Sequence, residues 1–310
     1  MLRHLTRLKT IVLLAAFALA AMPLAPAIFA QGIEFRFAPN DGAVEERRIK
    51  VTRVTQLEGE DDQVDELEKV VRIEKRKTAG GFTITERLVS ARSSHDGEST
   101  ENPILAALLE VDIVKEAGDD GKLHDVRGYD KIVDVLNAKF PEAAAEWSAA
   151  IDAAEMAAQE KSEWEATVGR FAGKQAQIGD VWNGNEAFAP GGQGDGNVLA
   201  SVRFARFVPC GGRRCVQLDL TFGSEGQAAG NEVANVFEDA AHNKGQWVGQ
   251  TGSAVTGVSG RGERVIDPAT MDLVSEKIER TIRILVDVPG EGKLPMVIRE
   301  TSETAVAPRP

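Results

Sequence analysis

The sequence has few of the residues on which most catalytic and metal sites depend. It contains two cysteines, four histidines and one tyrosine among 310 residues. His95, His124 and His242 lie apart from one another and from both cysteines, and none belongs to an H-E-x-x-H motif. We therefore expect these histidines to be solvated or capping residues, and we predict no metal site and no catalytic residue.

Phosphate-binding and calcium-binding loops lack their required context. Gly192–Gly196 is rich in glycine, but a strand pattern follows it instead of a helix. Asp119-Asp120-Gly121 has no series of alternating acids after it, so we expect a turn instead of a Ca²⁺ loop. Gly257–Arg261 departs from the G-x-S-x-G motif at its last residue. We predict no cofactor, while a Ser-His-Asp triad assembled from distant residues stays open.

Acidic residues are missing from the chain before Glu34. Three basic residues precede an apolar run, Ile11–Ala21, and small residues continue as far as Ala30. This order is typical of a secretory signal. We predict that residues 1–30 form a signal peptide cleaved after Ala30. Cleavage after Ala27 and an uncleaved membrane anchor are the alternatives.

The rest of the chain is strongly acidic. Loss of residues 1–30 removes three basic residues and no acid, which takes the formal net charge from −12 to −15. Such a charge repels phosphate backbones, so we expect no nucleic-acid partner. No later apolar run is long enough for a transmembrane helix. We predict a periplasmic or secreted protein without a membrane span after cleavage.

Cys210 and Cys215 flank Gly211-Gly212 between two stretches of alternating apolar residues. We expect a β-hairpin with a four-residue loop whose end brings the two cysteines face to face. A structural disulfide is the favoured state in an oxidising compartment. Redox and zinc roles are less favoured alternatives, because the spacing is not C-x-x-C and no histidine is near.

Hydrophobic periodicity divides the mature chain into strands over residues 31–95, a mainly helical section over 102–175 and strands over 180–306. This order predicts an α+β fold, a curved, half-barrel-like antiparallel sheet with the central helical section packed on one side. We expect residues 31–310 to form a single domain, with two domains as the alternative. A phase change before Val54 indicates a bulge, and Glu303–Pro310 is expected to be a frayed tail.

Helical spacing places several large apolar residues where a pocket could form. An alanine-rich helix carries Trp147 and Ile151, and a second helix is expected to begin at the capping-box sequence Ser162–Glu165. Trp164 and Val168 share one face of that second helix. Because helices beneath a curved sheet line any apolar pocket there, we predict that these four residues line one. Core packing is the alternative role.

Asp120–Asp130, the helices after it, Ile178–Trp182 and the turn Arg264–Thr270 form a layout that resembles exported bacterial β-rich proteins with no assigned function. The expected architecture is also similar to the periplasmic lipoprotein-carrier half-barrels, although this chain is longer. That second resemblance implies an apolar cavity for acyl chains. Neither resemblance brings a catalytic residue with it.

These observations favour an exported, non-enzymatic protein that binds an apolar small molecule or an envelope protein. A structural or interaction protein of the cell envelope with a filled core is the alternative, and a hydrolase with an unrecognised site is the third hypothesis. A continuous cavity on the order of several hundred Å³ between sheet and helices would favour binding. A filled core would oppose it.

Overall fold

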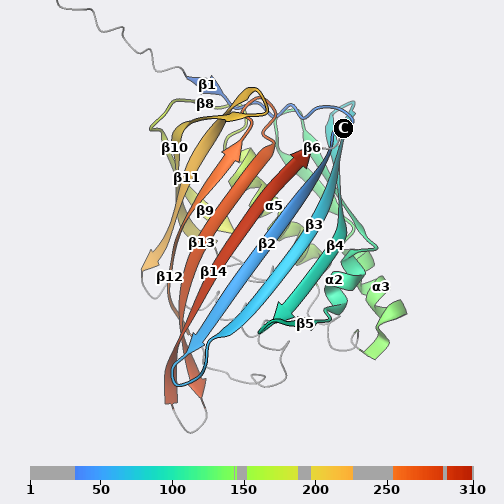
Figure 1. Cartoon of the computed structure of the whole chain (residues 1–310). Coiled ribbons are helices and arrows are strands. Elements are labelled where there is room, and N and C mark those ends of the chain that lie inside the picture. The colour runs from blue at the N-terminus through green and yellow to red at the C-terminus, as the bar shows by residue number, and fades with distance from the viewer. Residues whose placement is uncertain are drawn as a thin grey trace, which may run out of the picture. The chain divides into compact units, whose positions relative to one another are not determined.

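The computed structural model describes residues 32–142, 144, 152–187, 197–225, 254–288 and 292–308. The described strands form a twelve-stranded antiparallel sheet in the order β7-β6-β4-β3-β2-β14-β13-β12-β11-β10-β9, with β5 paired to β4 (Figure 1). These strands are β2 (Val44–Leu57), β3 (Gln63–Thr78), β4 (Gly81–His95), β5 (Glu98–Thr100), β6 (Asp112–Gly118), β7 (Leu123–Arg127), β9 (Val181–Ala187), β10 (Asn197–Cys210), β11 (Arg213–Glu225), β12 (Ala254–Ile266), β13 (Leu273–Val288) and β14 (Gly292–Pro308).

The other described elements are short. The helices are α2 (Pro103–Leu108), α3 (Asp130–Lys139) and α5 (Ala153–Trp164), and α5 continues into a π-helical turn, η1 (Glu165–Gly169). β1 (Ile33–Glu34) and β8 (Gln175–Ala176) form a separate two-stranded sheet. Residues from Ile33 onward form one compact unit. Among the described residues, no helix is long and apolar enough to cross a membrane.

The first and last strand sections belong to the same sheet because β14 pairs with β2. Their register runs from Met296 opposite Leu57 to Pro308 opposite Glu45. The frayed tail expected after Glu303 is therefore wrong as far as Pro308. The backbone of this segment is paired along β2, which the sequence pattern of the tail itself does not reveal.

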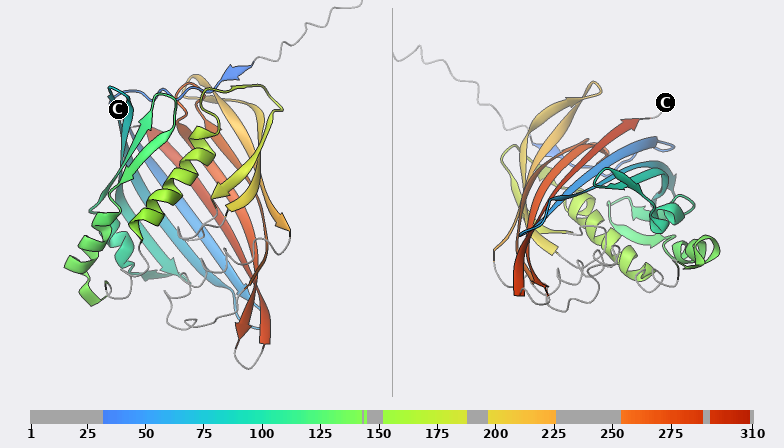
Figure 2. Two further views of the ribbon diagram at one scale, coloured as in Figure 1. Left: turned by 180° about the vertical axis from the view of Figure 1, so that it is seen from behind. Right: turned by 60° about the horizontal axis from the view of Figure 1, so that its bottom comes forward.

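The sheet is curved and unclosed, and its two edge strands both contact α5. The helix contacts β7 at one edge and β9 at the other. Figure 2 shows α5 crossing the concave side of the sheet. This arrangement confirms the curved antiparallel sheet with helices on one side, although the helices are a smaller part of the fold than we expected.

Helix α5 begins at Ala153 and not at Ser162. The Asp152 backbone is extended, and its carboxylate accepts hydrogen bonds from the backbone N–H groups of Ala154 and Glu155 at 2.8 and 3.1 Å. This is N-capping geometry. The predicted start at Ser162 is wrong, because the capping-box pattern lies inside a helix that Asp152 has already started.

Strand alternation separates a concave, core-facing side from a convex, charged side. On β13, Ile278, Ile282 and Ile284 are buried, while Lys277 and Arg283 are exposed as predicted. The alternation is continuous along β2, which pairs with both neighbours without a register shift.

The bulge predicted near Val54 is therefore wrong. Val54 is a half-buried apolar residue on the convex side, where the pattern predicts a polar one. The pairing of β2 continues past it without a register shift. The register shift in this part of the sheet lies instead between Val70 and Val71, where β3 pairs with β4.

The main core is packed against the concave side of β10, β11 and β13. Phe35, from the segment before β2, is fully buried, and its ring centroid lies 5.5 Å from that of Phe171 and 6.4 Å from that of Phe204. A smaller core joins α2 and α3 to β6 around Ile132 and Leu136. The interior beside β10 to β13 is therefore filled by protein side chains.

Candidate functional site

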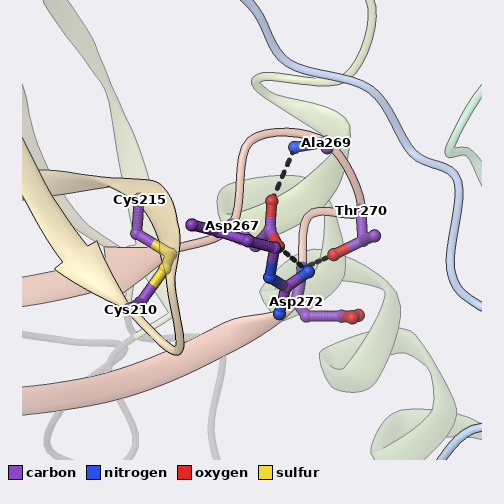
Figure 3. The surroundings of a disulfide bond; sticks show 7 residues. Cys210, Cys215, Asp267, Ala269, Thr270 and Asp272 are labelled. Carbon is purple, nitrogen blue, oxygen red and sulfur yellow. Dashed lines mark hydrogen bonds and ion pairs between the residues drawn. A yellow bond between two sulfur atoms is a disulfide. The ribbon is translucent and has the colours of Figure 1, made fainter.

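Cys210 and Cys215 form a disulfide at the β10–β11 hairpin (Figure 3). The hairpin turn consists of Gly211 and Gly212 alone, with φ values of 56° and 79°. The predicted four-residue loop is therefore wrong, because two glycines with positive φ close the hairpin in the tightest way. The register pairs Cys210 with Arg213, so the cysteines are diagonal neighbours with Cα atoms 5.8 Å apart.

The disulfide hairpin is anchored to the turn between β12 and β13. Arg213, in the first position of β11, forms an ion pair with the buried carboxylate of Asp267. That carboxylate also accepts a hydrogen bond from the backbone of Ala269 at 2.9 Å. Figure 3 shows the disulfide beside this turn. Asp267 is therefore held both by the disulfide hairpin and by its own turn, and these contacts are structural.

The four predicted pocket residues are only partly described by the structure. Trp147 and Ile151 lie outside the described residues. Trp164 ends α5, where its Nε1 donates a hydrogen bond to the Gly121 carbonyl at 2.8 Å, and both it and Val168 pack against the main core. Their role in lining a pocket stays a prediction.

A shallow hollow of about 380 Å³ lies over β12, β13 and β14. Its side chains include Arg261, Glu279 and Arg299, which alternate with the buried residues of these strands and point away from the core. This hollow is therefore on the convex side. It is not the apolar cavity between sheet and helices that the sequence led us to look for.

The concave side of β2 and β3 carries apolar residues that the core does not cover. Ile49, Val51 and Leu67 share the core-facing parity, yet each is half-buried, and none packs against either core cluster of the described residues. Val51 lies directly opposite Leu67 in the register. We call these three residues the concave apolar patch. Helix α5, which crosses this side of the sheet, has no buried residue.

A buried charge cluster fastens α5 to the sheet near β6. Lys115 is 5 % exposed, and its Nζ lies 2.9 Å from the Glu86 carboxylate and forms a second ion pair with Glu160 of α5. Tyr129 donates its hydroxyl hydrogen to the other Glu160 oxygen at 2.8 Å. The ammonium group of Lys115 and the hydroxyl of Tyr129 therefore both bind the Glu160 carboxylate of the helix.

The pKa values in this cluster follow from burial and from the ion pairs. Burial favours the neutral form of Lys115, but Glu86 and Glu160 outweigh it and raise the pKa of the amine. Burial likewise acts to raise the pKa of Glu86, but Lys115 and then Arg47 hold it below its ordinary value. Burial and the charge of Glu160 raise the pKa of the Tyr129 hydroxyl, which therefore stays a donor.

Almost every described cation on the concave side of the sheet has a carboxylate partner. The ion pairs are Arg47–Glu45, Arg53–Glu300, Lys75–Glu45, Lys75–Asp272, Lys115–Glu86 and Arg264–Glu276. Half-buried Lys69 differs, because it makes no ion pair within the described part of the chain; exposed Lys77, at the end of the same strand, makes none there either. Lys69 lies opposite Ile49, beside the concave apolar patch.

The sequence reasoning missed these charged residues, although a signal was present. Leu67, Val71 and Ile73 share the core-facing parity of β3, and Lys69 occupies the same parity between them. Lys115 stands in the same way between the buried residues Ile113 and Ala117. A lysine on the apolar parity of a strand indicates a buried ion pair or a polar site on the core side.

The structure places the two described histidines apart from each other. His95 lies with one ring nitrogen 2.8 Å from Asp65 and the other 3.2 Å from Asp96. His124 is exposed. Within the described ranges, no group of three or more histidine, cysteine or acidic side chains could hold a metal ion.

Comparison with known proteins gives only distant likenesses. No family model and no curated protein matches this chain. Among solved structures, one of lipid–protein interactions in lipovitellin has a TM-score of 0.46 at 10% identity over 88% of this chain, which spans about a quarter (26%) of the lipovitellin chain. An exported protein with a YmcC-like fold from Bacteroides fragilis has a TM-score of 0.23 at 11% identity, with 86% of this chain and 97% of that chain covered. These scores are too low to support an argument about function.

Proposed function

We propose that this protein is an exported, non-enzymatic binding protein whose ligand has an apolar chain. The ligand lies on the concave side of β2 and β3, beneath α5. The concave apolar patch is the observation that supports this function, since its residues have the parity of a core but stay half-buried. Trp164 and Val168, which the sequence predicts as pocket lining, lie at and just after the end of the helix and pack against the main core.

The energetic argument rests on the area that a ligand would cover. Removal of apolar surface from water contributes about 25 cal/mol per Å², so a chain that covers all three side chains gains a few kcal/mol from them. The proposed route to this function is export by residues 1–30 with cleavage after Ala30, and the Cys210–Cys215 bridge fits an oxidising compartment.

A structural or interaction protein of the envelope is the second candidate. The filled interior around Phe35, Phe171 and Phe204 favours it, because this half of the fold leaves no room for a ligand. The two candidates differ in what they predict for the concave apolar patch. A binding protein uses the patch for a ligand, whereas a structural protein has no need of it.

The test is binding of a neutral apolar fluorophore, N-phenyl-1-naphthylamine, to the mature chain. We expect saturable binding that Val51→Asp weakens by about tenfold or more, because a carboxylate in the patch disfavours an apolar chain. Val54→Asp is the matched control, since Val54 is a half-buried valine of the same strand on the convex side. Equal loss in both variants, or no binding to the wild-type chain, would favour the structural candidate. Native mass spectrometry of protein from its own source would then identify any co-purified ligand.

A further inference from the structure

Lys69 is a half-buried cation at the edge of the concave apolar patch. It lies opposite Ile49 on β2 and opposite Ala91 on β4. Its neighbours of the same parity along β3 are Leu67 and Val71. The residues directly opposite Lys69 and its same-parity neighbours on β3 are therefore all apolar.

No carboxylate among the described residues forms an ion pair with Lys69. Its charge acts on Glu86 and Glu163, where it is a minor influence that lowers the pKa of each carboxylate. Glu86 is already paired with Lys115 at 2.9 Å. A half-buried cation loses part of its hydration, and without a close counter-ion no ion pair offsets that loss.

From this arrangement we infer that the ligand is a long-chain amphiphile with an anionic headgroup, and that Lys69 pairs with that headgroup. The inference rests on the proposed function. The chain of the amphiphile covers Ile49, Val51 and Leu67, and its carboxylate or phosphate lies at the end of the patch that Lys69 marks. An anionic group supplies the counter-ion that the described protein residues do not.

The acidic net charge of the protein does not oppose this pairing at short range. At physiological ionic strength, charges separated by more than about 8 Å are largely screened, whereas a direct ion pair beside apolar side chains is screened much less. The electrostatic energy of the headgroup at Lys69 therefore depends mainly on the charges in direct contact with it. The other nearby cations already form ion pairs within the protein, since Arg47 pairs with Glu45 at 2.9 Å and Arg53 with Glu300 at 3.0 Å.

The experiment compares three ligands with the same sixteen-carbon chain: hexadecanoate, hexadecyl phosphate and hexadecanol. Each displaces N-phenyl-1-naphthylamine from the wild-type chain and from Lys69→Met, Lys69→Arg and Lys77→Met. Lys77 is an exposed lysine of the same strand and serves as the matched control. Thermal unfolding of each variant shows that it is folded before binding is compared.

We expect the wild-type chain to bind both anionic ligands about tenfold more tightly than hexadecanol. Lys69→Met should remove this preference and leave hexadecanol binding unchanged, while Lys69→Arg and Lys77→Met should retain it. Preference for only one of the two anions would identify the headgroup as carboxylate or phosphate. Equal binding of all three ligands to the wild-type chain, or a preference that survives in Lys69→Met, would overturn the role of Lys69 and leave the proposed function standing. Failure of every ligand and of the fluorophore would overturn the proposed function itself.

Discussion

Lys115 on β6 and Glu160 on helix α5 form an ion pair that joins the sheet to the helix crossing its concave side. The same amine lies 2.9 Å from Glu86, so a single buried cation is shared by two carboxylates. Helix α5 has no buried residue of its own. Its attachment therefore combines these polar contacts with the packing of partly buried apolar residues, Met156, Ala157 and Trp164, against the two cores.

Substitution of Lys115 by Met should destabilise the protein strongly. The change leaves Glu86 and Glu160 next to each other without their cation, and loss of one partner of a buried pair costs about 3–5 kcal/mol. Urea unfolding at neutral pH measures the effect, with Lys77→Met as the exposed control. Addition of Glu86→Gln and Glu160→Gln to Lys115→Met should recover part of the loss. No recovery would show that the amine acts through packing alone.

The same cluster should make stability depend on pH at both ends of the scale. The pKa of Glu86 is lowered in the folded protein from an ordinary value of 4.5, so its stabilising contribution is present above that value and is lost as the pH falls through the folded pKa. The pKa of Lys115 is raised from 10.5, so its contribution is complete below 10.5 and is lost as the pH rises through the folded pKa. Glu163 acts in the opposite direction to Glu86, because burial and then Glu160 raise its pKa.

Unfolding measured from pH 3 to pH 8 tests the acid side of this dependence. The difference in the free energy of unfolding between the wild type and Lys115→Met should be largest near pH 7 and should shrink at the acid end, where the carboxylates become protonated (with the ordinary pKa of about 4.5 as a guide). A constant difference over this range would contradict the assignment of the ion pair as its source.

Removal of the disulfide by the double change Cys210→Ser and Cys215→Ser should lower the free energy of unfolding by about 2 kcal/mol, because the bridge closes a short loop. Thermal unfolding with and without a reducing agent measures the loss. The reducing agent should shift the wild type toward the double variant and leave the double variant unchanged. Ligand binding should be unaffected, since the hairpin is anchored to the turn at Asp267 and not to the concave apolar patch.

Much of the local structure could be predicted because it depends on neighbours in the chain. The alternation of Val216, Leu218, Leu220 and Phe222 specifies a strand with one buried side, and all four are buried in the core. Gly211-Gly212 between two such strands specifies a hairpin turn, and its position explains why Cys210 and Cys215 come within bonding reach.

The candidate site could not be predicted in the same way, because its residues come together from distant parts of the chain. Lys69 has the apolar parity of β3, but only the register with β2 places it beside Ile49. Glu160 looks like any solvated helix residue in the sequence, and only the position of α5 brings it to Lys115.

Composition and periodicity by themselves determined the β-rich character of the chain, its sheet with one core-facing side and its hairpin disulfide, since each of these follows from local alternation and spacing. Only the tertiary structure decided that β14 pairs with β2 along almost the whole length of β2, so that the tail as far as Pro308 is a strand. It also decided that α5 contacts both edge strands of the sheet. Contacts between residues far apart in the chain decide these features. The backbone hydrogen bonds of a strand are satisfied by whichever neighbour the whole fold supplies.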